Sequence, residues 1–218
     1  MKQSVDVPWT EKLPFIPLRI IWILASLLIL PTIFFKLQLP MYLVPLCSVC
    51  AALPACIGTL AQLGIKALRK RDFSTILVIY LIIVVFSAVI GNIWQDFLAG
   101  RGYDFAEQQD IIREICNATT IQRVFMFISV CLLTPVVEEV LFRRLIYGLW
   151  SSKLWLAATI FTSLLFSLMH FFVLGIPTLF LIGLGCQFIC LYRQNLLLSI
   201  LLHCLINTVA FFANIALN

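Results

Sequence analysis

Seven apolar stretches of near membrane-spanning length follow one another along this chain. They lie at residues 18–35, 41–65, 74–98, 124–149, 154–173, 177–192 and 195–217. A helix rises about 1.5 Å per residue, so roughly 20 apolar residues cross the hydrocarbon core of a bilayer. Lipid offers the backbone no hydrogen bonds, so each stretch must satisfy its own polar groups as a helix. The sequence therefore predicts an all-α fold, a polytopic transmembrane bundle of about seven helices.

The composition excludes a soluble domain held by a single anchor. Of the 218 residues, 62% are hydrophobic and only 11% are charged, which is far from the balance of a soluble globular chain. The third and fourth stretches could each be interrupted and the sixth is short, so the number of helices is predicted to within one. We expect a multi-pass membrane protein surrounded by the lipid bilayer.

Basic residues are distributed unequally between the alternate connections of these helices. With the N-terminus inside, the cytoplasmic side holds Lys2, Lys12, Arg19, Lys66, Arg69, Lys70, Arg71, Arg143, Arg144, Lys153 and Arg193. The other side holds only Lys36, Arg101, Arg113 and Arg123. The positive-inside rule therefore predicts a cytoplasmic N-terminus and an external loop over residues 100–122. The net charge of +5 follows from this topology, and we expect no nucleic-acid partner.

Two glutamates, two histidines and an asparagine lie well inside the C-terminal stretches, where ionisable groups are costly and by default indicate a functional site. They are Glu138, Glu139, His170, His203 and Asn207, and they come from three separate stretches. At about 1.5 Å per residue from the cytoplasmic ends, Glu138 lies about 18 Å deep, His203 about 13 Å and Asn207 about 20 Å. His170 lies deeper, at about 25 Å, a difference that helix tilt can absorb. We expect these side chains to meet in one polar cavity.

Helical spacing assigns the two adjacent glutamates to different tasks. Glu139 and Arg143 are four residues apart with the acid first, which is the favourable order for an ion pair on one helix face. Glu138 points about a third of a turn away from Glu139 and is left free to face the cavity. The sequence therefore predicts a paired glutamate beside an unpaired one.

The same spacing places the histidines. His203 and Asn207 are four residues apart and share a face, while Phe166 lies one turn before His170 and can pack on its ring. In such a pocket Glu138 can act as a general base towards a water molecule that His170 also holds. His203 and Asn207 are hydrogen-bond donors suited to an oxyanion hole. Together these groups indicate hydrolysis of an amide in a membrane-associated substrate.

Three other interpretations of these residues stay open. Each polar residue can be structural, since a membrane histidine or asparagine often serves only as a hydrogen bond between helices. Two histidines and two carboxylates could hold zinc or iron, although the chain lacks an HExxH motif and Arg143 occupies one carboxylate. A non-catalytic transporter or an immunity-type binding protein would also place Glu and His at mid-membrane. The transporter interpretation is weakened by the absence of an inverted repeat in the sequence.

Three motifs occur in order on successive stretches: Glu138-Glu139-x-x-x-Arg143, Phe166-x-x-x-His170 and His203-x-x-x-Asn207. They resemble the motifs of the CAAX-protease and bacteriocin-processing (CPBP, or Abi) family of intramembrane proteases. The resemblance covers residues 124–210, and Phe180-x-x-Gly183 resembles the glycine-containing helix of that family, where a small residue permits close packing.

The resemblance implies a glutamic-type intramembrane endopeptidase without a cofactor or a metal. Its catalytic residues would be Glu138 and His170 for water activation, and His203 and Asn207 for the oxyanion; Glu139, Arg143 and Phe166 would support them. The substrate would be a membrane-associated peptide or protein, in some family members one with a prenylated CAAX terminus, and a bacterial member would lie in the inner membrane. We therefore divide the chain into an N-terminal cytoplasmic segment (1–17), N-terminal transmembrane helices with an external loop (18–123) and a catalytic core (124–217).

Overall fold

The computed structural model describes residues 15–38, 40–60, 68–105, 117–150 and 152–217, and every regular element within them is a helix. The N-terminal part contains α1 (Ile16–Leu24), the π-helix η1 (Ala25–Ile29), α2 (Leu30–Lys36), the 3₁₀ turn η2 (Met41–Leu43), α3 (Val44–Leu60) and α4 (Lys70–Ala99). The next helix is made of α6 (Thr120–Met126), η3 (Phe127–Leu133), α7 (Thr134–Glu139), η4 (Val140–Ile146) and η5 (Tyr147–Leu149). The chain continues through η6 (Ser152–Leu154), α8 (Trp155–Leu168), η7 (Val173–Gly175), α9 (Ile176–Arg193) and α10 (Leu196–Leu217). The predicted all-α class is confirmed.

Five helices in the described residues are long and apolar enough to cross a membrane. They span Ile16–Phe34, Lys70–Ala99, Thr120–Leu149, Val173–Arg193 and Leu196–Ala216, and two shorter apolar helices span Val44–Cys56 and Trp155–Leu168. Each of these segments overlaps one predicted stretch, so the bundle of about seven helices is confirmed and the protein is a multi-pass membrane protein. The predicted N-terminal segment up to residue 14, residues 61–65 of the second stretch and residues 106–116 of the predicted external loop lie outside the described residues.

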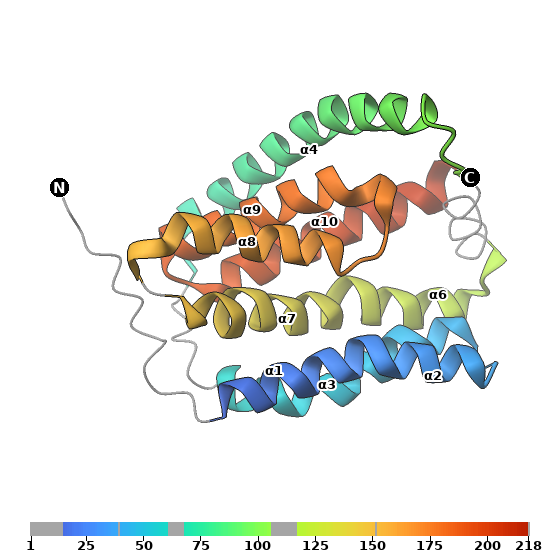
Figure 1. The fold of residues 1–218 in the computed structure, drawn as a ribbon, viewed down its shortest axis with the longest axis horizontal. Helices are drawn as coiled ribbons and strands as arrows, with labels where there is room; N and C mark the ends of the chain where they lie inside the picture. The colour runs from blue at the N-terminus through green and yellow to red at the C-terminus, as the bar shows by residue number, and fades with distance from the viewer. Residues whose placement is uncertain (1–14, 39, 61–67, 106–116, 151, 218) are drawn as a thin grey trace.

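The helices form layers that run along the long axis of the molecule (Figure 1). The α4 helix arches over one side and packs on α9, which in turn packs on α8 and α10. The long helix containing α7 lies beneath them, and α1, α2 and α3 cover its other side. The outer face of α4 is apolar and exposed, with Val85 61% and Ile93 65% accessible, as expected for a helix that faces lipid.

Gly183 brings α8 and α9 close together. A Cβ atom at this position would lie 3.0 Å from the Cα and Cβ atoms of Ser163 on α8. Because backbone cannot move aside cheaply, only glycine fits here, and the close packing predicted for the Phe180-x-x-Gly183 segment is confirmed.

The fourth stretch is a continuous helix with two π-helical segments, although an interruption was possible from its sequence. Thr119 caps its start, because its hydroxyl accepts from the Gln122 N–H and the Gln122 side chain accepts from the Thr119 N–H. Just before Pro135, the Thr134 N–H donates to the carbonyl of Ser129, five residues back. The proline is therefore accommodated by a widened turn instead of a break.

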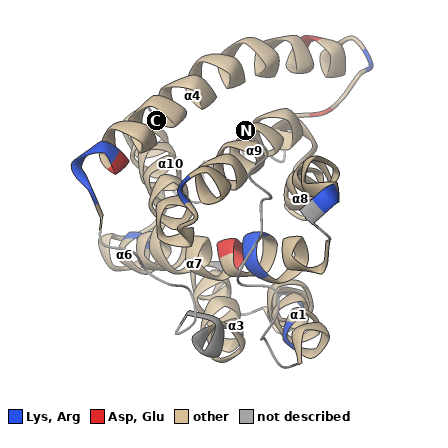
Figure 2. Ribbon diagram, turned by 90° about the vertical axis from the view of Figure 1, so that its left-hand side faces the viewer, with Lys and Arg blue, Asp and Glu red and all other residues tan. Residues whose placement is uncertain are grey.

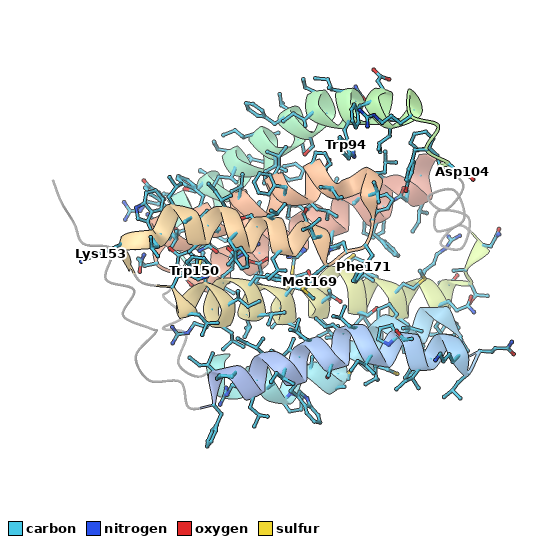
Figure 3. The ribbon with its side chains drawn as sticks, in the orientation of Figure 1. Trp94, Asp104, Trp150, Lys153, Met169 and Phe171 are labelled. Atoms are coloured by element: carbon cyan, nitrogen blue, oxygen red, sulfur yellow. The ribbon has the colours of Figure 1, made fainter. Side chains whose placement is uncertain are left out.

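The fifth helix is shorter than the stretch 154–173 that the sequence predicted. The α8 helix ends at Leu168, and His170 and Phe171 follow in a turn closed by N–H donation from Phe171 to the Leu168 carbonyl (3.1 Å). Phe171 adopts a left-handed conformation (φ 52°), which ends the helix. Figure 3 shows Met169 and Phe171 near the middle of the long axis, between Lys153 at one end and Asp104 at the other. The predicted C-terminal boundary of this helix was therefore wrong. His170 lies in the turn that follows the 14-residue α8 helix.

Candidate active site

Glu139 is the centre of a buried polar network. Its side chain is fully buried and accepts a hydrogen bond from Arg143 Nε at 2.9 Å, so the predicted ion pair between these residues is confirmed. The other carboxylate oxygen lies 2.9 Å from Nδ1 of His203 on α10, and the Ser199 hydroxyl also donates to Glu139. Acidic (red) and basic (blue) residues are neighbours on the helix that contains α7 (Figure 2). One carboxylate therefore connects α7, η4 and α10.

His203 lies between the two adjacent glutamates. Its Nδ1 faces Glu139, and its Nε2 lies 3.7 Å from Oε2 of Glu138. An ionised carboxylate can only accept, so the contact with Glu139 assigns the proton to Nδ1 of the imidazole. When the ring is neutral, the lone pair of Nε2 points towards Glu138. When the ring is charged, Nε2 carries a second proton that points there. The ring is thereby oriented by one glutamate and presented to the other.

Glu138 is the less engaged carboxylate, as its helical phase predicted. Its side chain is 14% exposed, and Oε2 is a buried oxygen without a hydrogen-bond partner among the described residues. Buried polar atoms are nearly always paired in proteins, with protein groups or with water. An unpaired carboxylate oxygen within 4 Å of an imidazole nitrogen therefore indicates a place for water or substrate.

The Phe166 ring contacts both histidines. Its centroid lies 4.7 Å from the His170 ring and 5.6 Å from the His203 ring, both edge-on. The sum of these distances, about 10 Å, is the largest possible separation of the two imidazole centroids. Arg143 lies over the same ring, with its guanidinium carbon 5.3 Å from the centroid. The predicted contact between Phe166 and His170 is confirmed. Phe166 packs against His170, His203 and Arg143.

The His170 side chain makes a hydrogen bond to the backbone at the end of α8. Its Nδ1 lies 2.7 Å from the Phe166 carbonyl oxygen, which can only accept, so Nδ1 carries the proton and Nε2 has a free lone pair. The residue is exposed, unlike buried His203. His170 therefore lies on the open side of the cluster, while Glu139 and His203 form its closed side.

Asn207 contacts the widened turn before Pro135. Its Nδ2 donates to the Val130 carbonyl at 2.9 Å. In the local π-helical register this carbonyl faces the nitrogen of residue 135, which as a proline has no hydrogen to donate. Asn207 therefore supplies the hydrogen bond that the helix backbone cannot make. The second hydrogen of the amide is left for another acceptor.

Glu139, Cys186 and His203 form a buried group whose ligand atoms lie within 4.8 Å of one another, as a metal site would require. The chemistry of this group fits a metal poorly. Glu139 already accepts from Arg143, Ser199 and His203, and a guanidinium beside the carboxylate repels a second cation. A metal ion would have to displace these donors and leave Arg143 as a buried charge without its partner, which is costly. The residues favour an ion pair at this position.

Two contacts around the site were not predicted from the sequence. Ser199 lies one turn before His203, and its spacing of four residues was the signal that could have identified it as a neighbour of Glu139. Trp94 on α4 donates through Nε1 to the Val173 carbonyl (3.0 Å) in the connection that follows His170. This tryptophan lies far from the polar motifs in the sequence, and no local pattern indicates it. In Figure 3 it lies on α4 beside the connection between α8 and α9.

The C-terminal half of the chain matches a protein-family model. Residues 120–209 match the model described as type II CAAX prenyl endopeptidase Rce1-like. Comparisons with curated proteins and with solved structures gave no significant match. The matched range contains the three motifs of the polar cluster and excludes α1 to α4.

Proposed function

We propose that the chain is a glutamic-type intramembrane endopeptidase, because residues 120–209 match the family model described as type II CAAX prenyl endopeptidase Rce1-like. Its substrates are membrane-associated peptides or proteins, including those with prenylated CAAX termini. The observation that carries the proposal is the unpaired, mostly buried Glu138 carboxylate beside an oriented imidazole. The test is an assay of purified protein in liposomes with a prenylated CAAX peptide, in which mass spectrometry identifies the cleaved bond.

Glu138 acts as the general base in the proposed reaction. Glu138 takes one proton from a water molecule whose other hydrogen is donated to His170 Nε2. The hydroxide that forms attacks the carbonyl carbon of the scissile peptide bond. The tetrahedral intermediate then expels the amine, which receives the proton that Glu138 took. The products are a carboxylic acid, which then loses its proton to solvent, and an amine, so Glu138 returns to its starting state.

His203 and Asn207 stabilise the negative oxygen of that intermediate. Asn207 has one amide hydrogen that is not used by the Val130 carbonyl. His203 donates through Nε2 when both its ring nitrogens are protonated, and Glu139 at Nδ1 provides the counter-charge for that imidazolium. Glu139 and Arg143 therefore position His203 without touching the substrate.

Replacement of Asn207 by Ala should lower kcat by about two to three powers of ten, the loss typical of removing one oxyanion donor. KM should change little, because the interaction strengthens only in the transition state. The matched control is Asn214→Ala on the same helix, where the exposed amide donates to the Ala210 carbonyl at 2.9 Å. Equal activity losses in the two variants, or a kcat loss that disappears at a temperature where both are fully folded, would assign Asn207 a structural role only.

Removal of divalent ions should leave the activity intact, because a carboxylate and not a metal activates the water in this proposal. The purified protein is treated with a strong chelator, its residual metal is measured, and the peptide assay is repeated. Activity that is lost on chelation and restored by stoichiometric zinc would instead support the metal-dependent alternative. Glu139, Cys186 and His203 would then be the first ligands to replace.

Replacement of Trp94 by Phe should make the connection between α8 and α9, which contains His170, less rigid. An aromatic ring remains, but the N–H group that donates to the Val173 carbonyl is lost. We expect kcat to fall about tenfold for one lost hydrogen bond of ~1–1.5 kcal/mol, with the pH dependence unchanged. The control is Trp22→Phe, which removes a similar bond (2.8 Å) to the Ala51 carbonyl far from the cluster. If both variants lose activity in proportion to their thermal stability, Trp94 has no positioning role.

A transporter or an immunity-type binding protein is the alternative function. Both would use buried glutamate and histidine without peptide hydrolysis. Toxin binding or proton-coupled uptake that persists when no peptide cleavage is detectable would favour them.

A further inference from the structure

A second polar site lies where α4 begins and α9 ends, away from the polar cluster around Glu139. A cavity of about 230 Å³ is lined by Arg69 and Arg71 before and at the start of α4, by Tyr192 and Arg193 at the end of α9, and by Asn195 beyond it. Its one acidic lining residue, Asp72, accepts from the Arg69 N–H and from Arg193. Three arginines and one aspartate line the cavity, which therefore has an excess of positive charge.

Arg193 has unused hydrogen-bonding capacity in this cavity. Its Nε is buried and has no hydrogen-bond partner in the part of the chain that the structure describes. Its guanidinium lies over the Tyr192 ring, with the carbon 6.0 Å from the centroid. A buried guanidinium donor without an acceptor favours an anionic oxygen as its missing partner.

An apolar groove lies between the same pair of helices, about one helix turn from this basic cavity along α9. The groove has a volume of about 330 Å³ and is lined by four residues of α4 and four of α9, among them Ile82 and Phe188. Phe188 lies one turn from Tyr192, and the two rings stack with centroids 5.7 Å apart and planes 5° from parallel. Because Tyr192 lines the basic cavity and Phe188 lines the groove, the two spaces adjoin along one face of α9.

The distance between the basic cavity and the apolar groove matches the distance between the headgroup layer and the hydrocarbon core of a membrane. The groove begins about 6–10 Å along the helices from the arginines, because Tyr192 and Phe188 are four positions apart and Asp72 and Ile79 are seven positions apart at about 1.5 Å per residue. The polar headgroup layer of a leaflet is about 5–8 Å thick, so a ligand with its charge in the cavity would have its apolar part in the hydrocarbon core. Gly185 opens the floor of the groove, where a Cβ would lie 2.6 Å from Ile83 Cδ1.

We propose that the basic cavity and the adjoining groove bind one anionic phospholipid, with its phosphate among Arg69, Arg71 and Arg193 and an acyl chain between α4 and α9. Basic pockets between transmembrane helices on the cytoplasmic side commonly hold acidic lipid headgroups, and the predicted topology places these arginines on that side. The site goes beyond the proposed proteolysis and does not depend on it. It would fix α4, which lies outside the region that matches the family, against the catalytic helices.

The test measures lipid binding to the full chain in neutral detergent by native mass spectrometry. Phosphatidylglycerol should bind one-to-one and more tightly than phosphatidylcholine with the same acyl chains. Arg69→Gln and Arg71→Gln should each weaken phosphatidylglycerol about fivefold, and the double variant about 25-fold. Lys70→Gln removes the same charge between them, from a residue that does not line the cavity, and should leave the affinity unchanged.

The groove is tested by filling it. Ile82→Trp should weaken both lipids about tenfold if the indole displaces two methylene groups, while Leu81→Trp should have no effect. Both residues are 51% exposed, so neither replacement disturbs the core, and only Ile82 lines the groove. Lipid-free thermal unfolding of each variant checks that the fold is intact.

Three outcomes would overturn the proposal. The first is an equal loss in the Lys70→Gln variant, which would mean diffuse charge attraction. The second is equal affinity for inorganic phosphate or for deacylated glycerophosphoglycerol, which would leave no role for the groove. The third is displacement of phosphatidylglycerol by a prenylated CAAX peptide at lower concentration, which would make the seam between α4 and α9 a substrate site.

Discussion

Replacement of Glu138 by Gln should abolish peptide hydrolysis, with kcat falling by two to four powers of ten as the general base is lost. The amide is nearly the same size as the carboxylate but cannot take a proton from water. The measurement is the liposome assay with the prenylated peptide, followed at substrate concentrations above KM. Peptide binding should persist, so the inactive variant should retain uncleaved substrate.

A second replacement separates chemistry from folding in this variant. Asp96→Asn is the matched control, because it makes the same chemical change on an exposed acid of α4 and should retain full activity.

A Glu138→Gln variant with unchanged hydrolysis would end the glutamic-type proposal. A variant that keeps transport or toxin binding while the unmodified protein shows no peptide cleavage would support the non-catalytic alternative. The two results differ in the behaviour of the unmodified protein, so one set of assays distinguishes them.

Replacement of Glu139 by Ala should destabilise the bundle by about 3–5 kcal/mol, the typical cost of leaving one partner of a buried ion pair alone. Arg143 would remain as an uncompensated charge, since its side chain is fully buried in the ion pair. The free energy of unfolding is measured by denaturant titration in mixed micelles, with thermal unfolding as a second probe.

A double variant identifies the cause of that loss. Glu139→Gln combined with Arg143→Met removes both charges, so it should be more stable than Glu139→Ala alone. It should nevertheless be inactive, because His203 would lose the negative counter-charge beside Nδ1 that stabilises its imidazolium form. A double variant as unstable as the single one would show that packing of these side chains, and not charge, stabilises the site.

The sequence predicted the contacts that depend on spacing along one helix. The pairs Glu139 with Arg143 and Phe166 with His170 are each four residues apart, and both contacts occur as predicted. The sequence could not predict which glutamate orients His203, because that depends on how α7 and α10 face each other. The π-helical segments on both sides of α7 also shift the rotation of that helix away from the 3.6-residue period used to place Glu138.

The end of α8 was mispredicted for a related reason. Residues 169–173 contain neither glycine nor proline, so the apolar stretch carries no stop signal between Leu168 and Gly175. The helix ends because Phe171 adopts a left-handed conformation that tertiary contacts must maintain. Contacts such as the one between Trp94 and Val173 join residues 79 positions apart, beyond the reach of any local pattern.

The ring of Phe166 limits the shape of a substrate that can pass between the two histidines. Their centroids are at most about 10 Å apart, and the thickness of the rings narrows the gap further. An intact α-helix with its side chains is about 10–12 Å wide and would not fit. In the proposed reaction His170 holds the attacking water and His203 donates to the oxyanion, so the scissile bond would lie between the two rings and the protein would select unwound chain. Extended tails and segments that break their helix easily would be cut, while regular transmembrane helices in the same bilayer would be spared.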